Sequence, residues 1–481
     1  MRSRHLGALA VVTLLACLVG QAVAQRTPRP AAPTGPALRL GALLTLNGPG
    51  AWFGAEIKQG LELAAAELDA GSPRTIPPDG SAAESEGRPS SEATPKVASE
   101  PKPSSEATPK AAAEPKRSTP PPAVGSGADA ASPDAGEPKK AAPRPATEPI
   151  EPRDRQRTLS LVIQAVDVQP LDVRDAEAEA QRLLASGVSA ILTAAPTPTL
   201  AVYPLASSRD VLVLHAGIAT DRFPATSRVL IQLRPGPGIR ADVLAAYAWE
   251  RGMRRLAVVA GGDGFGRAVR AAVAARWRKQ GGQLTHEESV SLDGSDLRSR
   301  LRTATRSGPE AIVLGFEGAA LGQAARALRE AGHTGLILAV DDDRAAILAA
   351  GRALDGALLL SDAFVPVPGT RGALFARAYE ARHSQPPSRF AANAYDVAIL
   401  LFEAAERSVA SGRGLTASRL REVLSTGGPF PSLYAGDLVL RDDGTLGRPL
   451  ALFRVDGERA AFEGYVGLDG RVLPKPAGAT P

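Results

Sequence analysis

The chain has 481 residues, of which 44% are hydrophobic, which allows two or three domains with sizeable apolar cores. Its 56 lysines and arginines exceed its 51 aspartates and glutamates by only five. No basic block with interleaved aromatic residues occurs, which argues against nucleic-acid binding.

The first residues have the pattern of an export signal. Arg2 and Arg4 precede an apolar run from Leu6 to Gly20, and Ala22-Val23-Ala24 is a small-residue cleavage pattern. The apolar run is shorter than the ~20 residues that a membrane-spanning helix needs. We therefore predict a signal peptide over residues 1–24 and a periplasmic location.

The single cysteine gives this segment a second interpretation. Leu14-Leu15-Ala16-Cys17 resembles the lipobox of bacterial lipoproteins, in which the cysteine is lipidated and anchors the chain. Leu18 and Val19 extend the apolar run past Cys17, which favours cleavage after Ala24. A chain cleaved there has no thiol for a disulfide, a metal site or a nucleophile.

The first globular stretch reads as strand, turn and helix. Leu38–Leu46 is short and apolar, Asn47–Gly50 favours a turn, and apolar residues recur at helical spacing from about Phe53 to Leu68. Open α/β sheets bind ligands at the carboxyl ends of their strands. Trp52 and Phe53, placed in this turn, are therefore candidates for stacking on a ligand, with packing on the hinge side as the alternative.

A long insert follows. Residues 71–156 have almost no large apolar side chain and are rich in Pro, Ala, Ser, Glu and Lys. Such a segment buries too little apolar surface to offset the entropy of ordering it, so we predict a disordered insert. Pro89–Lys102 and Pro103–Lys116 are a direct repeat, which indicates a duplicated spacer; a tether to the cell wall or to a partner is the alternative.

Globular sequence resumes as an alternation of strands and helices. The alternation predicts a parallel sheet covered on both faces. Strands are expected at Leu159–Val166, Val188–Leu192 and Val211–His215, and helices at Asp175–Ala185 and Leu200–Ser208, with a turn over Ala194–Thr199.

After Val229–Arg234 and Pro235-Gly236-Pro237 the alternation starts again, which predicts a second sheet of the same kind. Its elements are expected at Ile239–Arg251, Leu256–Val259, Gly266–Gln280, Leu284–Val290, Asp296–Arg306, Ala311–Gly315, Ala319–Ala331 and Leu336–Val340. Gly356–Val365 is expected to cross back, before helices at Phe375–His383 and Ala391–Val409 and strands at Tyr434–Val439 and Ala451–Val455.

The order of these elements resembles type I periplasmic binding proteins of the branched-chain amino acid transport class. Gly48-Pro49 with Trp52-Phe53-Gly54 is similar to the loop that ends their first strand. Further matches are Asp263-Gly264-Phe265-Gly266, Asp296-Leu297, Pro309-Glu310-Ala311 and Ala394-Tyr395-Asp396. The resemblance covers Leu38–Ala70 and about Leu159–Tyr465.

This resemblance implies an α/β, two-lobed fold in which each lobe is a mostly parallel sheet flanked by helices and three crossovers join the lobes. Lobe one would comprise residues 38–70, 157–234 and 363–430, with the insert inside it. Lobe two would comprise residues 235–362 and 431–470, and residues 471–481 would form a flexible tail. Two lobes joined in this way can close on a ligand.

The resemblance also implies where an amino acid would be held. In the family, backbone N–H groups and hydroxyls at a strand-to-helix turn bind the carboxylate, and here Thr197 and Thr199 occupy that turn. Pro196 and Pro198 depart from the family's Ser-rich pattern because proline has no N–H to offer. Helix capping by a threonine is the alternative.

The turn after the next strand supplies further candidates. Gly217 would let a ligand approach the backbone, and Ala219 or Thr220 stands at the family's hydroxyl position, depending on the alignment. His215 reads as a packed strand residue. Asp341 corresponds to the family's acidic partner for the ammonium group, with a solvated turn as the alternative. Phe265 and Phe316 would also face the cleft.

An enzyme is the first competing interpretation. Gly261–Gly266 lacks the spacing of dinucleotide-binding and P-loop motifs, and the scattered histidines form no catalytic or metal-binding motif. We therefore predict no enzymatic activity, no cofactor and no metal site.

We expect an exported solute-binding protein, a monomer, that captures an amino acid or a related compound and serves a membrane ABC transporter. The alternative is an envelope interaction or regulatory protein that keeps the fold without transport; an enzyme or a nucleotide-binding protein is less favoured.

Overall fold

The computed structural model describes residues 37–70, 159–218, 223, 227–340 and 344–474, all of which belong to one compact unit. The predicted signal peptide, the insert at 71–156 and the tail beyond residue 474 lie outside the described residues. Within the described ranges, no helix combines the length and apolar character that a membrane span requires.

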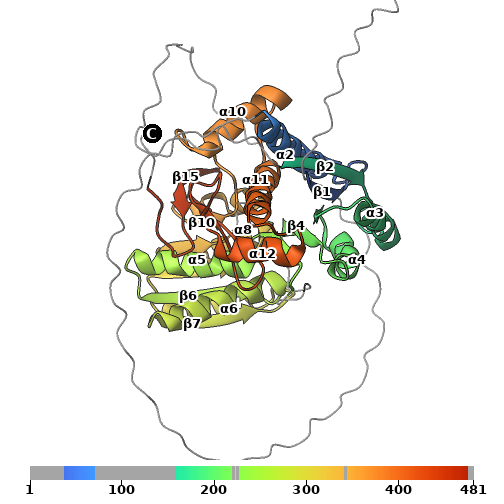
Figure 1. The fold of residues 1–481 in the computed structure, drawn as a ribbon. Helices are drawn as coiled ribbons and strands as arrows, with labels where there is room; N and C mark the ends of the chain where they lie inside the picture. The colour runs from blue at the N-terminus through green and yellow to red at the C-terminus, as the bar shows by residue number, and fades with distance from the viewer. Residues whose placement is uncertain (1–36, 71–158, 219–222, 224–226, 341–343, 475–481) are drawn as a thin grey trace, which may run out of the picture. The chain divides into compact units, whose positions relative to one another are not determined.

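The first sheet has five parallel strands in the order β2-β1-β3-β4-β5. Figure 1 labels β1, β2 and β4 of this sheet. Helices α2 and α11 pack on one face, and α3 and α4 on the other. The strands are β1 (Ala37–Leu44), β2 (Ser160–Asp167), β3 (Ala190–Thr193), β4 (Leu212–Ile218) and β5 (Leu230–Arg234), and the helices are α2 (Ala51–Asp69), α3 (Val173–Ala185), α4 (Pro196–Ser207), α10 (Arg371–His383), α11 (Arg389–Ala410) and α12 (Ala417–Thr426).

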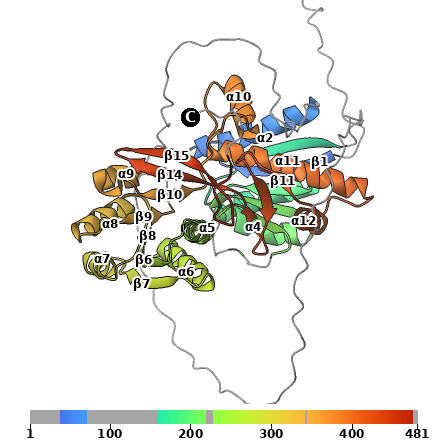
Figure 2. The ribbon, with the colours of Figure 1, turned by 90° about the vertical axis from the view of Figure 1, so that its left-hand side faces the viewer.

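The second sheet has seven strands in the order β15-β14-β10-β9-β8-β6-β7, parallel except for β14 and β15. Helices α5 and α6 cover one face, and α7, α8 and α9 the other (Figure 2). The strands are β6 (Arg255–Gly261), β7 (Gln283–Val290), β8 (Ala311–Gly315), β9 (Leu336–Ala339), β10 (Leu358–Ser361), β14 (Leu450–Asp456) and β15 (Arg459–Val466), and the helices are α5 (Pro237–Glu250), α6 (Gly264–Lys279), α7 (Leu297–Arg306), α8 (Gly318–Glu330), α9 (Arg344–Ala350) and the 3₁₀ helix η1 (Gly351–Leu354).

A third, small sheet lies beside the first. It consists of β11 (Phe430–Pro431), β12 (Asp437–Leu440) and β13 (Leu446–Gly447). The Gln232 amide in β5 donates a hydrogen bond of 2.9 Å to the Gly444 carbonyl. The loop before β13 therefore covers the edge of the first sheet that β5 would otherwise leave unpaired.

The chain crosses between the large sheets after β5, after β10 and before β14. The predicted fold class, two mainly parallel sheets flanked by helices, is confirmed. The division of the chain into lobes at particular residues remains a prediction. The segment at Phe430–Gly447, which we assigned mostly to lobe two, contacts β5 of the first sheet.

Several boundaries differ from the sequence-based expectation. Helix α4 begins at Pro196, so the residues expected in a turn form its first helical residues; proline is well suited to the first position of a helix. Trp52 and Phe53 lie in the first turn of α2 rather than in the loop. Strand β15 and helix α12 were not predicted, and β15 replaces Ala451–Val455 as the last strand.

Helices α2 and α11 approach closely because glycine lies at their contact. A Cβ atom at Gly60 would stand 2.3 Å from the carbonyl oxygen of Ala391, a backbone atom that cannot rotate away. A Cβ atom at Gly54 would likewise stand 2.0 Å from the carbonyl oxygen of Thr45. Gly60 thus permits the pairing of α2 with α11, whereas Gly54 permits the close approach of α2 to the loop that precedes it.

We predict that Gly60→Ala lowers the free energy of unfolding by about 1–3 kcal/mol, because the added methyl group forces the two helices apart. Chemical denaturation of the full chain measures this loss. Gly238→Ala in α5 is the matched control: its Cβ would meet nothing closer than 3.7 Å, and alanine favours a helix by about 0.5–1 kcal/mol. Equal stability of the two variants would contradict the packing argument.

Candidate functional site

Both large sheets have a point where the strand order reverses, and such points are where open α/β sheets bind ligands. In the first sheet β1 lies between β2 and β3, and in the second β6 lies between β7 and β8. Six of the predicted site residues follow the four strands that flank these points: Trp52, Phe53, Thr197, Thr199, Phe265 and Phe316.

An aromatic cluster lies at the start of α2. The ring centroids of Trp52, Phe53 and Phe390 lie 5.6–5.9 Å apart in edge-on and tilted arrangements. Trp52 is 39% exposed, whereas Phe53 packs against the first core. Phe390, in the first turn of α11, was not predicted, because it lies 337 residues after Phe53 and 338 after Trp52 in the sequence. The exposed part of the Trp52 ring is the surface that the cluster offers to a ligand.

A buried ion cluster adjoins these rings. Arg234 at the end of β5 donates two hydrogen bonds, of 2.6 and 3.2 Å, to the Asp362 carboxylate that follows β10. Arg389, the first residue of α11, donates a third, of 3.2 Å. The Arg234 guanidinium also lies 5.2 Å from the centre of the Phe390 ring. The cluster thus connects two crossovers to the aromatic residues.

Asp362 stays ionised although it is only 1% exposed. Burial raises the pKa of Asp362, but the positive charges of Arg234, Arg389 and Arg240, together with the Arg234 hydrogen bonds, lower the pKa by more. The net pKa lies well below the ordinary value for aspartate. A carboxylate buried in this way stabilises the fold only while its arginine partners remain.

The two predicted threonines differ in their surroundings. Thr199 is fully buried, and its hydroxyl donates to the Ala195 carbonyl at 2.7 Å and contacts the Thr193 hydroxyl at 2.6 Å and His215 Nδ1 at 2.9 Å. Its hydrogen bonds therefore connect α4 with β3 and β4. Thr197 is half-buried in the first turn of α4, which leaves it the better placed of the two to contact a ligand.

His215 is a packed strand residue, as predicted. It is fully buried, and its ring meets Phe223 edge-on at 4.7 Å. A Cβ atom at Gly217 would stand 2.6 Å from the His215 ring, so glycine there is required by packing on the histidine. Ala219, Thr220 and Asp341 lie outside the described residues, and their proposed roles remain predictions.

Phe265 and Phe316 follow β6 and β8 and are both half-buried. Phe265 packs against the core on the α5 and α6 side, and Phe316 against the core on the opposite face of the same sheet. Each ring thus keeps one part on the core and one part accessible.

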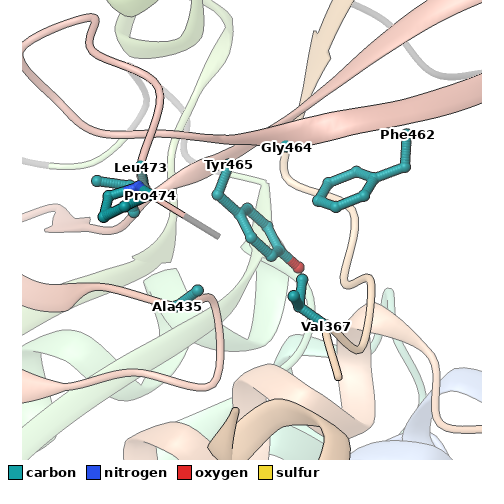
Figure 3. A pocket seen from close by; sticks show the side chains of 7 residues that line it. All are labelled: Val367, Ala435, Phe462, Gly464, Tyr465, Leu473 and Pro474. Atoms are coloured by element: carbon teal, nitrogen blue, oxygen red, sulfur yellow. The ribbon is translucent and has the colours of Figure 1, made fainter. Parts of the chain in front are cut away.

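One small cavity of about 30 Å³ is lined by apolar side chains near the end of the chain. Figure 3 shows the Tyr465 ring between Phe462 and the pair Leu473 and Pro474. The Tyr465 hydroxyl is engaged with the backbone of Val365, at 2.7 Å from its amide and 2.9 Å from its carbonyl. The cavity has room for a water molecule but not for an amino acid. Among the described residues, no group of three or more His, Cys, Asp or Glu side chains could hold a metal ion.

Residues 164–460 match the sequence model of a protein family that is described as "periplasmic binding protein". The chain belongs to this family. The match begins within β2 and ends at the start of β15, so it includes all three crossovers with Arg234 and Asp362 but not β1 and α2. A search of curated proteins found no match.

Solved structures with a similar fold have low sequence identity to this chain. A putative branched-chain amino acid ABC transporter protein from Rhodospirillum rubrum has a TM-score of 0.62 at 16% identity, covering 89% of this chain and 99% of its own. A branched-chain amino acid ABC transporter periplasmic ligand-binding protein from Burkholderia xenovorans has a TM-score of 0.58 at 17% identity, covering 90% and 96%. An ABC transporter substrate-binding protein from Desulfitobacterium hafniense in complex with Leu has a TM-score of 0.53 at 18% identity, covering 89% and 99%.

We predict that Asp362→Asn lowers the free energy of unfolding of this periplasmic binding protein by about 3–5 kcal/mol at pH 7, because it leaves buried Arg234 and half-buried Arg389 without their shared carboxylate. Since the pKa of Asp362 is lowered in the folded state, its stabilising contribution is complete above about pH 4 and is lost as the pH falls towards the folded value. The difference between wild type and variant should therefore shrink below about pH 4.

Denaturation curves at several pH values measure this difference. Asp69→Asn is the control: Asp69 is exposed at the end of α2, so its replacement should change stability by less than about 0.5 kcal/mol. An Asp362→Asn variant as stable as the control at pH 7 would show that the ion cluster contributes nothing to the fold.

Proposed function

We propose that this protein captures a small ligand, an amino acid or a related compound, and delivers it to a membrane ABC transporter. Family membership carries the proposal, because it identifies a periplasmic binding protein, a class of binding proteins rather than of enzymes. The arrangement of the sheets supports it, because six of the predicted residues follow the strands where each sheet reverses its order. Membership also implies a periplasmic location.

In this proposal Trp52 and Phe53 contact the apolar part of the ligand, with Phe265 and Phe316 on the second sheet. Thr197 and Gly217 approach its polar part, and Ala219, Thr220 and Asp341 are further predicted contacts. The comparison structure from Desulfitobacterium hafniense was solved in complex with Leu, which makes leucine a reasonable first probe. We propose a monomer that contacts a permease and no nucleic acid.

A second candidate function is an envelope interaction protein that keeps the fold without transport. The surroundings of Thr199 favour it, because this hydroxyl is already committed to three partners within the first sheet. Pro196 and Pro198 also remove two N–H groups from the turn that would bind a carboxylate. The two candidates differ in whether any small molecule stabilises the isolated chain.

We predict that at least one amino acid, amide or organic acid raises the melting temperature of the purified mature chain. A ligand at about a hundred times its dissociation constant stabilises a protein by ~2.7 kcal/mol, which thermal denaturation detects readily. Trp52→Ala should lower the affinity for that ligand. Trp249→Ala is the control and should leave the affinity unchanged, because Trp249 packs against Trp277 in the core of the second sheet. A broad panel without any stabilising compound, together with a wall or membrane protein that co-purifies with the chain, would favour the second candidate.

We also predict that the mature protein begins at Gln25. Intact mass spectrometry of protein secreted by its native export route distinguishes this from the alternative. Cleavage after Ala24 gives an unmodified chain, whereas processing before Cys17 adds eight residues and the mass of attached lipid. Detection of the lipidated form would contradict cleavage after Ala24 and would show that the protein is anchored to the membrane through Cys17.

A further inference from the structure

Arg240 is a buried cation for which the described residues supply no partner. It lies in the first turn of α5, is only 7% exposed, and its Nε atom has no hydrogen-bond partner. Within the part of the chain that the structure describes, its side chain forms no hydrogen bond and no ion pair. The positive charge of Arg240 lowers the pKa of Asp362, but the Asp362 carboxylate already accepts hydrogen bonds from Arg234 and Arg389.

The charges around Arg240 do not balance. Arg234 and Arg389 donate hydrogen bonds to the Asp362 carboxylate, and Arg240 is near enough for its positive charge to lower the pKa of Asp362 as well. Glu56 accepts a hydrogen bond from the Ser388 hydroxyl beside Arg389. Even when Glu56 is counted in full, these described side chains leave one positive charge over, since three arginines face two carboxylates. The amino ends of α5 and α11 add partial positive charge, so two of these arginines lie where a helix disfavours a cation.

A buried charge without a partner costs several kcal/mol, and a protein tolerates it where another group supplies the opposite charge. We propose that Arg240, with the Arg234–Asp362–Arg389 cluster, forms an anion subsite that binds the carboxylate of the ligand. This inference deepens the proposed function and rests on it, because it defines the class of ligand that the same site accepts.

The neighbouring rings define the rest of that ligand. The Arg234 guanidinium lies 5.2 Å from the centre of the Phe390 ring, and the Trp52 ring lies 5.6 Å from the same ring. Trp52 is 39% exposed and the Arg389 side chain 24% exposed, so solvent reaches both the apolar and the cationic part. The subsite therefore fits a small carboxylate with a net charge of −1 that carries an aromatic ring or a branched apolar chain.

A free amino acid fits this subsite less well. Its ammonium group would enter a region that already has surplus positive charge, and its net charge of zero would leave that surplus in place. We expect the des-amino analogue of an apolar amino acid to bind about tenfold more tightly than the amino acid itself, the lower end of what a hydrogen-bonded charge contributes.

The experiment compares matched compounds on the full mature chain by thermal denaturation and calorimetry. The pairs are 4-methylpentanoate with leucine and 3-phenylpropanoate with phenylalanine; 3-phenylpropanamide is the uncharged member. We expect the two carboxylates to stabilise the protein most and the amide least.

Arg240→Gln tests the residue itself. We expect carboxylate affinity to fall at least about tenfold while the melting temperature of the ligand-free protein stays the same or rises, because the substitution removes an unpaired buried charge. Arg240→Lys, which keeps the charge, should retain part of the affinity. Arg298→Gln is the control: this exposed arginine pairs only with Glu330 at 3.4 Å, so neither quantity should change.

The outcomes separate the two levels of the proposal. Amino acids that bind as tightly as their des-amino analogues, or an Arg240→Gln variant with unchanged carboxylate affinity, would overturn the anion subsite and leave the proposed function standing. A panel in which no small molecule stabilises the chain would overturn both. Should Arg240→Gln fail to fold, the comparison of carboxylate, amide and amino acid on the wild-type chain decides.

Discussion

The buried carboxylate of Asp362 is the point at which the parts of this protein are tied together. It follows the last parallel strand of the second sheet, and its partners come from the end of the first sheet and from the start of α11. Because a buried carboxylate is stable only when its charge is compensated, these three segments must meet in one arrangement. Two of the three crossovers thereby become anchored to the same ion cluster.

A second buried network holds the remaining crossover. Asp396 in α11 accepts hydrogen bonds from the Ser432 hydroxyl at 2.6 Å and from the Leu433 amide at 3.1 Å. Burial raises the pKa of Asp396, and the charge of Arg448 and the Ser432 hydrogen bond offset only part of that rise. Arg448 is itself 1% exposed and donates to the Leu233 carbonyl at 2.6 Å, directly before Arg234. Helix α11 therefore contacts the chain near every crossover.

The same helix links this scaffold to the candidate site. Its amino end carries Arg389 and Phe390 side by side, one in the ion cluster and the other among the aromatic residues. Gly60 in α2 lets α11 approach closely, and Phe390 at the start of α11 packs against Trp52 and Phe53. A rigid frame that brings a cationic group next to an exposed ring provides both charge recognition and apolar contact for a small ligand.

Local patterns in the sequence were sufficient for the architecture. Short apolar runs, glycine and proline turns and helical spacing predicted most strands and helices, because burial between two layers of helices imposes those patterns on any parallel sheet. They were less reliable at helix ends: Pro196 begins α4, where a turn was expected. Thr199 matched a family position, but only the fold shows that its hydroxyl is taken by Thr193, Ala195 and His215.

The ion cluster was decided by tertiary structure alone. Arg234, Asp362 and Arg389 are separated by 128 and 27 residues, and no spacing rule relates them. An arginine usually lies in solvent, so nothing in the sequence marked Arg234 at the end of β5 or Arg240 in α5 as buried. Local composition determined which segments fold into strands and helices, whereas the convergence of crossovers determined which charges lie together, because electrostatic pairing depends on distance in space and not along the chain.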